Sequence, residues 1–129
     1  MLHPARMMDA FQIVKLLGFV LMLSAGQLLF KQTALSTAAL KNISGVLSLA
    51  SNSWFWLAIG LYGSATVLWV AILQRTPLSV AYPFTALAFV AVPLASWAFM
   101  GESLNFGYFL GGAFIIAGIG VIAFSSFGM

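Results

Sequence analysis

Two polar residues near the end of an apolar run have the spacing of neighbours on one helical face. Gln27 and Lys31 are four residues apart, a separation that places both side chains on the same side of an α-helix. The cation can bind an anionic head group that enters between helices, and the amide can face a cavity. A structural role stays open, because Gln27 can instead hydrogen-bond a neighbouring helix and Lys31 can extend to a membrane interface.

The sequence contains no set of residues typical of a catalytic or metal site. It has one histidine, His3, two acids, Asp9 and Glu102, in different segments, and no cysteine. There is no Ser–His–Asp set, no glycine loop that would hold a phosphate and no cluster of metal ligands. We therefore expect that the protein is not an enzyme and uses neither a metal nor a cofactor.

The composition indicates that the chain is embedded in a lipid bilayer. Five Lys or Arg and two Asp or Glu are its only charged residues among 129, whereas 63% of the residues are apolar. Soluble domains usually carry about 25% charged residues, and so few charges cannot cover the apolar surface of a short chain. The net charge of +3 is spread along the sequence, which argues against a nucleic-acid partner.

Four apolar runs predict an all-α integral membrane protein, an antiparallel bundle of four transmembrane helices within one domain of residues 1–129. The helices are expected at about 11–31, 54–74, 78–100 and 105–125, each near the length that spans a bilayer. A β-barrel would show shorter segments of alternating polarity. The first run is interpreted as a retained helix and not a signal peptide. Segment 43–49 forms either a short interfacial turn or an extension of the second helix.

The distribution of cations weakly favours cytoplasmic termini. Four crossings place Arg6, Lys15 and Arg75 on one side of the membrane and Lys31 and Lys41 on the other. Cytoplasmic loops carry an excess of Lys and Arg, but three cations against two is a small bias. Insertion in both orientations, and hence an antiparallel dimer, stays open.

The same topology places Lys31 and Glu102 on one side of the membrane, where they can form an ion pair. Such a pair is either structural or a latch that an anionic substrate breaks.

The third expected helix contains two internal prolines, Pro83 and Pro93. Proline removes a backbone donor and kinks a helix, and within a membrane the freed carbonyls can line a cavity. The helix therefore either bends during alternating access or keeps a fixed kink that shapes packing. Tyr82 and Thr85 are the polar positions of this helix, and we count both as candidate substrate-binding residues.

Glycines and aromatic residues mark further contact surfaces. Gly107 and Gly111 form a GxxxG pair in the fourth helix, and Gly118 follows seven residues later. Glycines on one face allow helix backbones to approach closely, either within the protomer or across a dimer. Trp54 and Trp97, with Trp56, Tyr62, Tyr82 and Tyr108, match an aromatic belt at the membrane interfaces.

Several of these stretches together resemble a known family. They are SAGQLLFKQ at 24–32, TVLWVAILQRTP at 66–77, AYP at 81–83 and GE at 101–102, followed by the glycine-rich fourth helix. The combination is similar to the small-transporter branch of the drug/metabolite transporter superfamily, which includes EamA-like and small multidrug resistance-like proteins. Within that branch it resembles most the subunits of the flippase for aminoarabinose linked to undecaprenyl phosphate.

The resemblance implies a four-helix protein of the bacterial inner membrane that works as a homodimer or with a sister subunit. It implies movement of an anionic polyprenyl-phosphate lipid, with or without a sugar, between leaflets, as in lipid A modification. By position, Gln27, Lys31 and Tyr82 would line the lipid path, and Arg75 is a further candidate.

Two alternatives remain. A small-multidrug-resistance-type exporter of small solutes would be expected to carry a membrane-embedded glutamate, but Leu23 occupies the matching position, and Thr85 lies near the position of a tryptophan. No acid lies within any of the four runs, which argues against export of cationic drugs. The other alternative is a non-transporting membrane subunit that stabilises a partner.

Overall fold

The computed structural model describes residues 10–127 and forms this part of the chain from helices alone. They are α1 (Ala10–Ser36), α2 (Ile43–Ala50), α3 (Ser53–Leu73), α4 (Leu78–Thr85), α5 (Ala88–Met100) and α6 (Phe106–Phe127). Four stretches in this part are long and apolar enough to cross a membrane: α1, α3, α4 with α5, and α6. The predicted all-α fold with four spanning helices is confirmed. His3, Arg6 and Asp9 lie outside the described residues.

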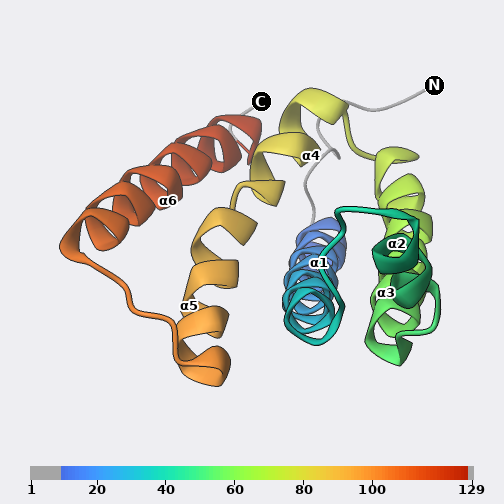
Figure 1. Ribbon diagram of the computed structural model, residues 1–129. Helices are drawn as coiled ribbons and strands as arrows, with labels where there is room; N and C mark the ends of the chain where they lie inside the picture. Colours follow the sequence, from blue (N-terminus) through green and yellow to red (C-terminus); the bar gives the residue numbers. More distant parts are fainter. Residues whose placement is uncertain (1–9, 128–129) are drawn as a thin grey trace.

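The first helix is the centre of the arrangement. It lies between α3 on one side and α4 with α5 on the other, and α6 lies beyond α5 (Figure 1). Apolar side chains from α1, α3, α4 and α6 meet in one core: Leu16, Phe19, Ala65, Ile72, Ala81, Phe84 and Ile119. Many other large apolar side chains point outward, including Phe99 and Phe124, as expected for helices whose outer faces contact hydrocarbon.

The connection between the first two spans contains the separate helix α2. Asn42 caps its start by accepting a hydrogen bond from the Gly45 backbone N–H at 3.0 Å. Gly45 is required there, because a Cβ atom would lie 2.0 Å from the carbonyl oxygen of Ala39. Asn52 caps α3 and also donates to the Ser36 hydroxyl at 2.9 Å. Segment 43–49 is therefore a helix of its own and does not extend α3.

The third span is broken between α4 and α5. The Ala86 and Leu87 backbone N–H groups donate to carbonyls three residues back, each at 3.0 Å, so the α-helical pattern is lost there. The Thr85 hydroxyl donates to the Tyr82 carbonyl at 2.6 Å, which is the carbonyl that Ala86 would reach in a continuous helix. With Pro83 before the break and Pro93 after it, the third span bends beside α1.

A buried polar contact connects the start of α1 to the turn before α4. The Thr76 hydroxyl donates to the side-chain oxygen of Gln12 at 3.1 Å, and the two residues are only 2% and 1% exposed. An unpaired amide at this depth would be costly. The contact therefore helps to fix α1 against the α3–α4 turn.

We expect Thr76→Val to lower stability by about 0.5–1.5 kcal/mol, because it removes one hydrogen bond while keeping the side-chain shape. Thermal unfolding of the purified protein in detergent measures the change. Thr66→Val is the matched control, because the Thr66 hydroxyl bonds only to its own helix, at the Tyr62 carbonyl. Equal stabilities for the Thr76 variant and the unmodified protein would contradict the assigned role of this contact.

Candidate functional site

Two adjoining cavities form a groove between α1, α3 and the bent third span. The aromatic cavity, of about 230 Å³, is lined by Phe19, Leu23, Tyr62, Ala65, Thr66, Trp69, Tyr82 and Thr85. The Gln27 cavity, of about 390 Å³, is lined by Leu23, Gln27, Tyr82, Thr85, Ala88, Phe89, Val92 and Pro93. Leu23, Tyr82 and Thr85 belong to both cavities, so the two spaces lie side by side.

Regular helical spacing aligns one wall of this groove. Phe19, Leu23 and Gln27 of α1 are each four residues apart, and Lys31 is the next residue of the same row. Residues four apart lie on one helical face. From α3, Tyr62, Thr66 and Trp69 repeat at intervals of four and three residues, which also keeps them on one face. The groove thus runs along α1 toward the helix end that carries Lys31.

The structure brings together four of the residues singled out in the sequence. Gln27, Tyr82, Thr85 and Pro93 all line the groove. The Gln27 side chain is exposed and Tyr82 is 64% exposed. Because both lie on the spanning helices, this side of the groove opens to the surrounding lipid or to a partner subunit.

Lys31 and Glu102 form an ion pair at the end of the row, with Lys31 Nζ 3.7 Å from a Glu102 carboxylate oxygen. The chain reaches α1 here because Gly101, at φ 72°, ends α5 in the left-handed conformation, which favours glycine. Both side chains are half exposed, and exposed ion pairs contribute only about 0–1 kcal/mol. The pair therefore joins α1 to the α5–α6 connection by a contact that a competing anion can replace.

Arg75 lies away from the groove. It follows α3 and precedes Thr76, whose hydroxyl bonds to Gln12 near the start of α1. Lys31 is 19 residues further along α1 than Gln12, or ~28 Å at 1.5 Å per residue. The structure therefore does not bring Arg75 together with Gln27 and Lys31, and it does not support a shared binding site for the three.

The glycines of α6 divide between an inner and an outer face. A Cβ atom at Gly112 would lie 3.6 Å from the Val90 side chain, whereas one at Gly111 or Gly118 would meet nothing within 4 Å. At Gly107 the near atom is the side-chain oxygen of Asn105, at 3.3 Å. Among the described residues, Gly107, Gly111 and Gly118 thus do not pack α6 against another helix, whereas Gly112 packs α6 against α5.

Tyr108 provides the polar contact between the same two helices. Its hydroxyl donates a hydrogen bond to the Val90 carbonyl. Together with Gly112 on the Val90 side chain, this contact orients α6 so that the face with Gly111 and Gly118 points away from the bundle.

Several lining residues were not recognised as functional in the sequence. By sequence, Tyr62 belongs with the interfacial aromatic residues, and Trp69 and Thr66 belong only to the 66–77 motif. Spacing along the second span could have grouped Tyr62, Thr66 and Trp69. Nothing in the sequence distinguishes Phe19 from other apolar residues of its helix, and only packing against α3 shows its role.

The lining of the groove is uncharged and carries a few polar groups. In the part of the chain that the structure describes, no charged side chain lines either cavity, and the polar groups are hydroxyls, one amide and the indole N–H of Trp69. Among residues 10–127, no three or more His, Cys, Asp or Glu side chains gather so that they could hold a metal ion. The lining offers hydrogen-bonding groups and apolar surface with which a ligand can be bound.

Comparisons with known proteins point to one group of relatives. The chain is 37% identical over 98 residues to the "Probable 4-amino-4-deoxy-L-arabinose-phosphoundecaprenol flippase subunit ArnE" of Escherichia coli O45:K1, covering 76% of this chain and 84% of that relative. Relatives of the same name in Salmonella typhimurium and Salmonella newport are each 44% identical over 66 residues, or 51% of this chain.

The aligned part spans only 60% of the length of each of these two Salmonella relatives. No family model matches the chain, and no solved structure matches it significantly. The relatives' names describe subunits of a transporter and not enzymes. At 37% identity over three quarters of its length, the chain belongs to the family of ArnE flippase subunits.

Proposed function

We propose that this chain is a subunit of an inner-membrane flippase that moves a polyprenyl-phosphate-linked sugar between leaflets. The observation that carries the proposal is the groove itself, which is mainly apolar, contains the Gln27 amide and leads to Lys31. The relatives' names state that those proteins act on 4-amino-4-deoxy-L-arabinose-phosphoundecaprenol, and we assign a substrate of this class to this chain.

The arrangement of charge suits a lipid with a polar head group. A polyprenyl tail can stay in the bilayer while the head group crosses, so the protein needs a groove and not a sealed chamber. A charge in the hydrocarbon is costly unless it is paired or hydrated. Lys31 supplies a cation at the end of the groove, and Gln27, one turn earlier on the same face, supplies amide donors.

The ion pair gives this groove a latch. With Lys31 held by Glu102 at 3.7 Å, α1 is joined to the α5–α6 connection. A lipid phosphate competes with the carboxylate for the same ammonium group, so substrate entry separates Lys31 from Glu102. We propose that substrate binding and loosening of this end of the bundle are coupled in this way.

Transport in liposomes tests the proposal. The subunit is purified with any subunit that co-purifies from its own membrane, and transfer of geranyl phosphate carrying one arabinose is followed across the bilayer. We expect faster transfer than in protein-free liposomes, and equal rates would contradict the proposal. Resistance to quaternary ammonium compounds on expression, without lipid transfer, would instead support an exporter of small solutes.

We also propose that the outer glycine face of α6 contacts a second subunit, either another copy of this chain or a sister subunit. The relatives are named as subunits, and a Cβ atom at Gly111 or Gly118 would meet nothing within 4 Å in the part of the chain that the structure describes. Small residues on one face are typical of close contacts between membrane helices.

The double substitution Gly111→Ile and Gly118→Ile is expected to lower the dimeric or heterodimeric fraction at least tenfold, because branched side chains keep the helix backbones apart. Native mass spectrometry of the protein extracted from its own membrane measures this fraction. Gly60→Ile and Gly63→Ile on α3 are matched controls, since a Cβ atom at either position also meets nothing within 4 Å. An unchanged subunit composition in the α6 variant would exclude this face as the contact.

A further inference from the structure

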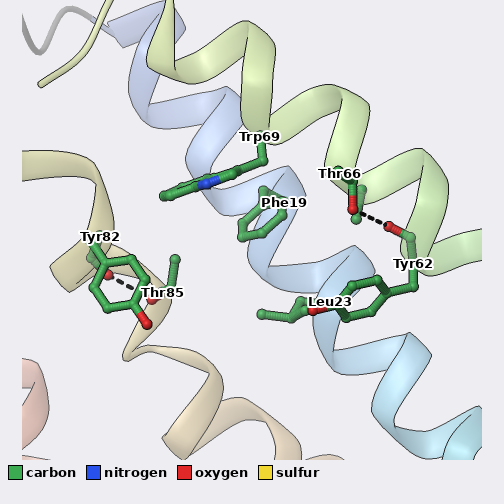
Figure 2. A pocket seen from close by; sticks show the side chains of 8 residues that line it. Phe19, Leu23, Tyr62, Thr66, Trp69, Tyr82 and Thr85 are labelled. Carbon is green, nitrogen blue, oxygen red and sulfur yellow. Dashed lines mark hydrogen bonds between the residues drawn. The ribbon is translucent and has the colours of Figure 1, made fainter. Parts of the chain in front are cut away.

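The aromatic cavity differs from the rest of the groove because half of its lining residues are aromatic: Phe19, Tyr62, Trp69 and Tyr82. The Phe19 and Trp69 rings stack with their centroids 4.8 Å apart, and the Tyr82 ring stands edge-on to Trp69 at 6.4 Å. Figure 2 shows the Phe19–Trp69 pair on one side and Tyr82 with Thr85 facing it from the third span. These contacts orient the Phe19, Trp69 and Tyr82 rings relative to one another.

The hydroxyl groups of the cavity supply both donors and acceptors. The Thr66 hydroxyl donates to the Tyr62 carbonyl at 2.9 Å, and the Thr85 hydroxyl donates to the Tyr82 carbonyl at 2.6 Å. Each threonine oxygen therefore keeps acceptor lone pairs. Among residues 10–127, no protein group is hydrogen-bonded to the phenolic hydroxyl of Tyr62 or Tyr82, so both phenols can donate to a ligand.

The chemistry of this wall disfavours two parts of a lipid-linked sugar, the phosphate and the prenyl chain. A phosphate would meet no cation here, since none of the described residues that line the cavity is charged, and an unpaired buried anion is costly. A prenyl chain would cover the phenol and threonine hydroxyls without pairing them.

A sugar ring satisfies both features of the cavity. Its C–H bonds can lie against the electron-rich faces of aromatic rings, and its hydroxyls can pair with phenol donors and threonine acceptors. The volume of about 230 Å³ is below the 300–1,000 Å³ range of ordinary ligand pockets. This size suits one small ring better than a larger head group.

We infer that the aromatic cavity is a sugar subsite that holds the monosaccharide ring of the lipid head group, while the phosphate stays outside it on the side of Lys31. The inference rests on the proposed flippase function and adds a preference for glycosylated lipid over the bare polyprenyl phosphate. Leu23 lies at the cavity and Lys31 eight residues further along α1, ~12 Å at 1.5 Å per residue. Because the Lys31 side chain extends away from the helix, its ammonium group can lie closer to the cavity than this distance along the axis. The remaining distance is comparable to the separation of a sugar ring and the phosphate bonded to it.

Binding measurements with two probes test the subsite. Geranyl phosphate carrying one arabinose and geranyl phosphate alone are titrated calorimetrically into the intact protein, with any co-purifying subunit, in lipid nanodiscs free of sugar detergents. We expect the glycosylated probe to bind at least tenfold more tightly. Trp69→Leu is expected to lower affinity for the glycosylated probe about tenfold, as loss of an aromatic stacking partner does elsewhere, and to leave affinity for the bare phosphate unchanged.

Two further sets of variants separate recognition from folding. Tyr62→Phe and Tyr82→Phe keep both rings and remove only the free hydroxyls, so they should lower the preference for the glycosylated probe without unfolding the cavity. Trp97→Leu is the matched control for Trp69, because Trp97 is an exposed tryptophan of α5 outside both cavities. It should leave both affinities unchanged.

The outcomes distinguish the subsite from the flippase function. Equal affinities of the unmodified protein for the two probes, or an equal loss for both in the Tyr62 and Tyr82 variants, would overturn the sugar subsite even if the liposome assay shows lipid transfer. A clear preference for the glycosylated probe that depends on Tyr62, Tyr82 and Trp69 would support it. If that preference appears and no lipid crosses the bilayer, the flippase proposal fails and the sugar subsite stands.

Discussion

Lys31→Glu is expected to reduce transfer of an anionic lipid-linked sugar in liposomes at least tenfold. The substitution removes the cation at the end of the groove and places a second carboxylate where Lys31 now lies 3.7 Å from Glu102. A phosphate approaching Gln27 would then meet two negative charges and no positive one. A tenfold change corresponds to about 1.4 kcal/mol, which reversal of a charge about 4 Å from the phosphate supplies near a protein surface.

A charge exchange separates the two roles of Lys31. In the double variant Lys31→Glu with Glu102→Lys the ion pair can form again, so thermal stability should return toward that of the unmodified protein. The rate of lipid transfer should stay low if transport requires an ammonium group on α1, in the same row as Gln27. Recovery of both stability and transfer would show that only the latch matters and that Lys31 does not contact the phosphate.

Lys41→Glu is the matched control for this charge reversal. Lys41 is an exposed cation in the connection before α2 and lies outside the groove. It carries the same charge as Lys31 but belongs to no part of the proposed lipid path. Its substitution should leave the transfer rate within about twofold of the unmodified protein, which is less than ~0.5 kcal/mol. Equal losses in both variants would indicate a general surface-charge effect and would exclude a specific role for Lys31.

The double substitution Pro83→Ala with Pro93→Ala is expected to slow lipid transfer at least tenfold while raising thermal stability. Proline inside a helix costs about 3 kcal/mol relative to alanine, because its ring excludes a carbonyl and it lacks a donor. With alanine at both positions, a straight helix over residues 78–100 competes with the bend between α4 and α5. A stiffer third span would change less easily between the arrangements that open the groove to either leaflet.

The same liposome assay and a thermal unfolding curve measure both effects. Pro77→Ala is the control, since Pro77 caps the start of α4 and does not interrupt a helix. Titration with the bare geranyl phosphate shows whether binding is retained. Unchanged transfer in a stabilised double variant would mean that the bend is fixed and only shapes packing, which is the alternative left open by the sequence.

Features that depend on a single helix, such as which residues share a face, could be predicted from the sequence, because α-helical geometry repeats every 3.6 residues. Gln27 and Lys31 were placed on one face by their spacing, and they continue the row of Phe19 and Leu23 that lines the groove. The prolines predicted a bend in the third span, and the bend occurs between them at Ala86 and Leu87. The predicted topology places Lys31 and Glu102 on the same side of the membrane, where an ion pair is possible, and the structure contains this pair.

Contacts between helices were less accessible to sequence reasoning. Apolar and aromatic residues on a spanning helix suit lipid, a neighbouring helix or a cavity equally well, since all three surroundings are apolar. Tyr62 therefore looked like an interfacial aromatic residue, yet it lines the aromatic cavity. Arg75 was a candidate for the lipid path, yet the structure separates it from Lys31 along the length of α1.

By itself the sequence determined that this chain crosses a membrane four times, keeps acids out of its spans and places an amide and a cation on one face of its first helix. Low charge and long apolar runs are sufficient for those conclusions, because the bilayer admits few other structures. Only the tertiary structure decided that α3 and the bent third span meet that face to form an aromatic cavity, and that Gly112, and not Gly111 or Gly118, packs α6 onto α5. These choices depend on how side chains from distant segments fit together, which spacing within one helix does not specify.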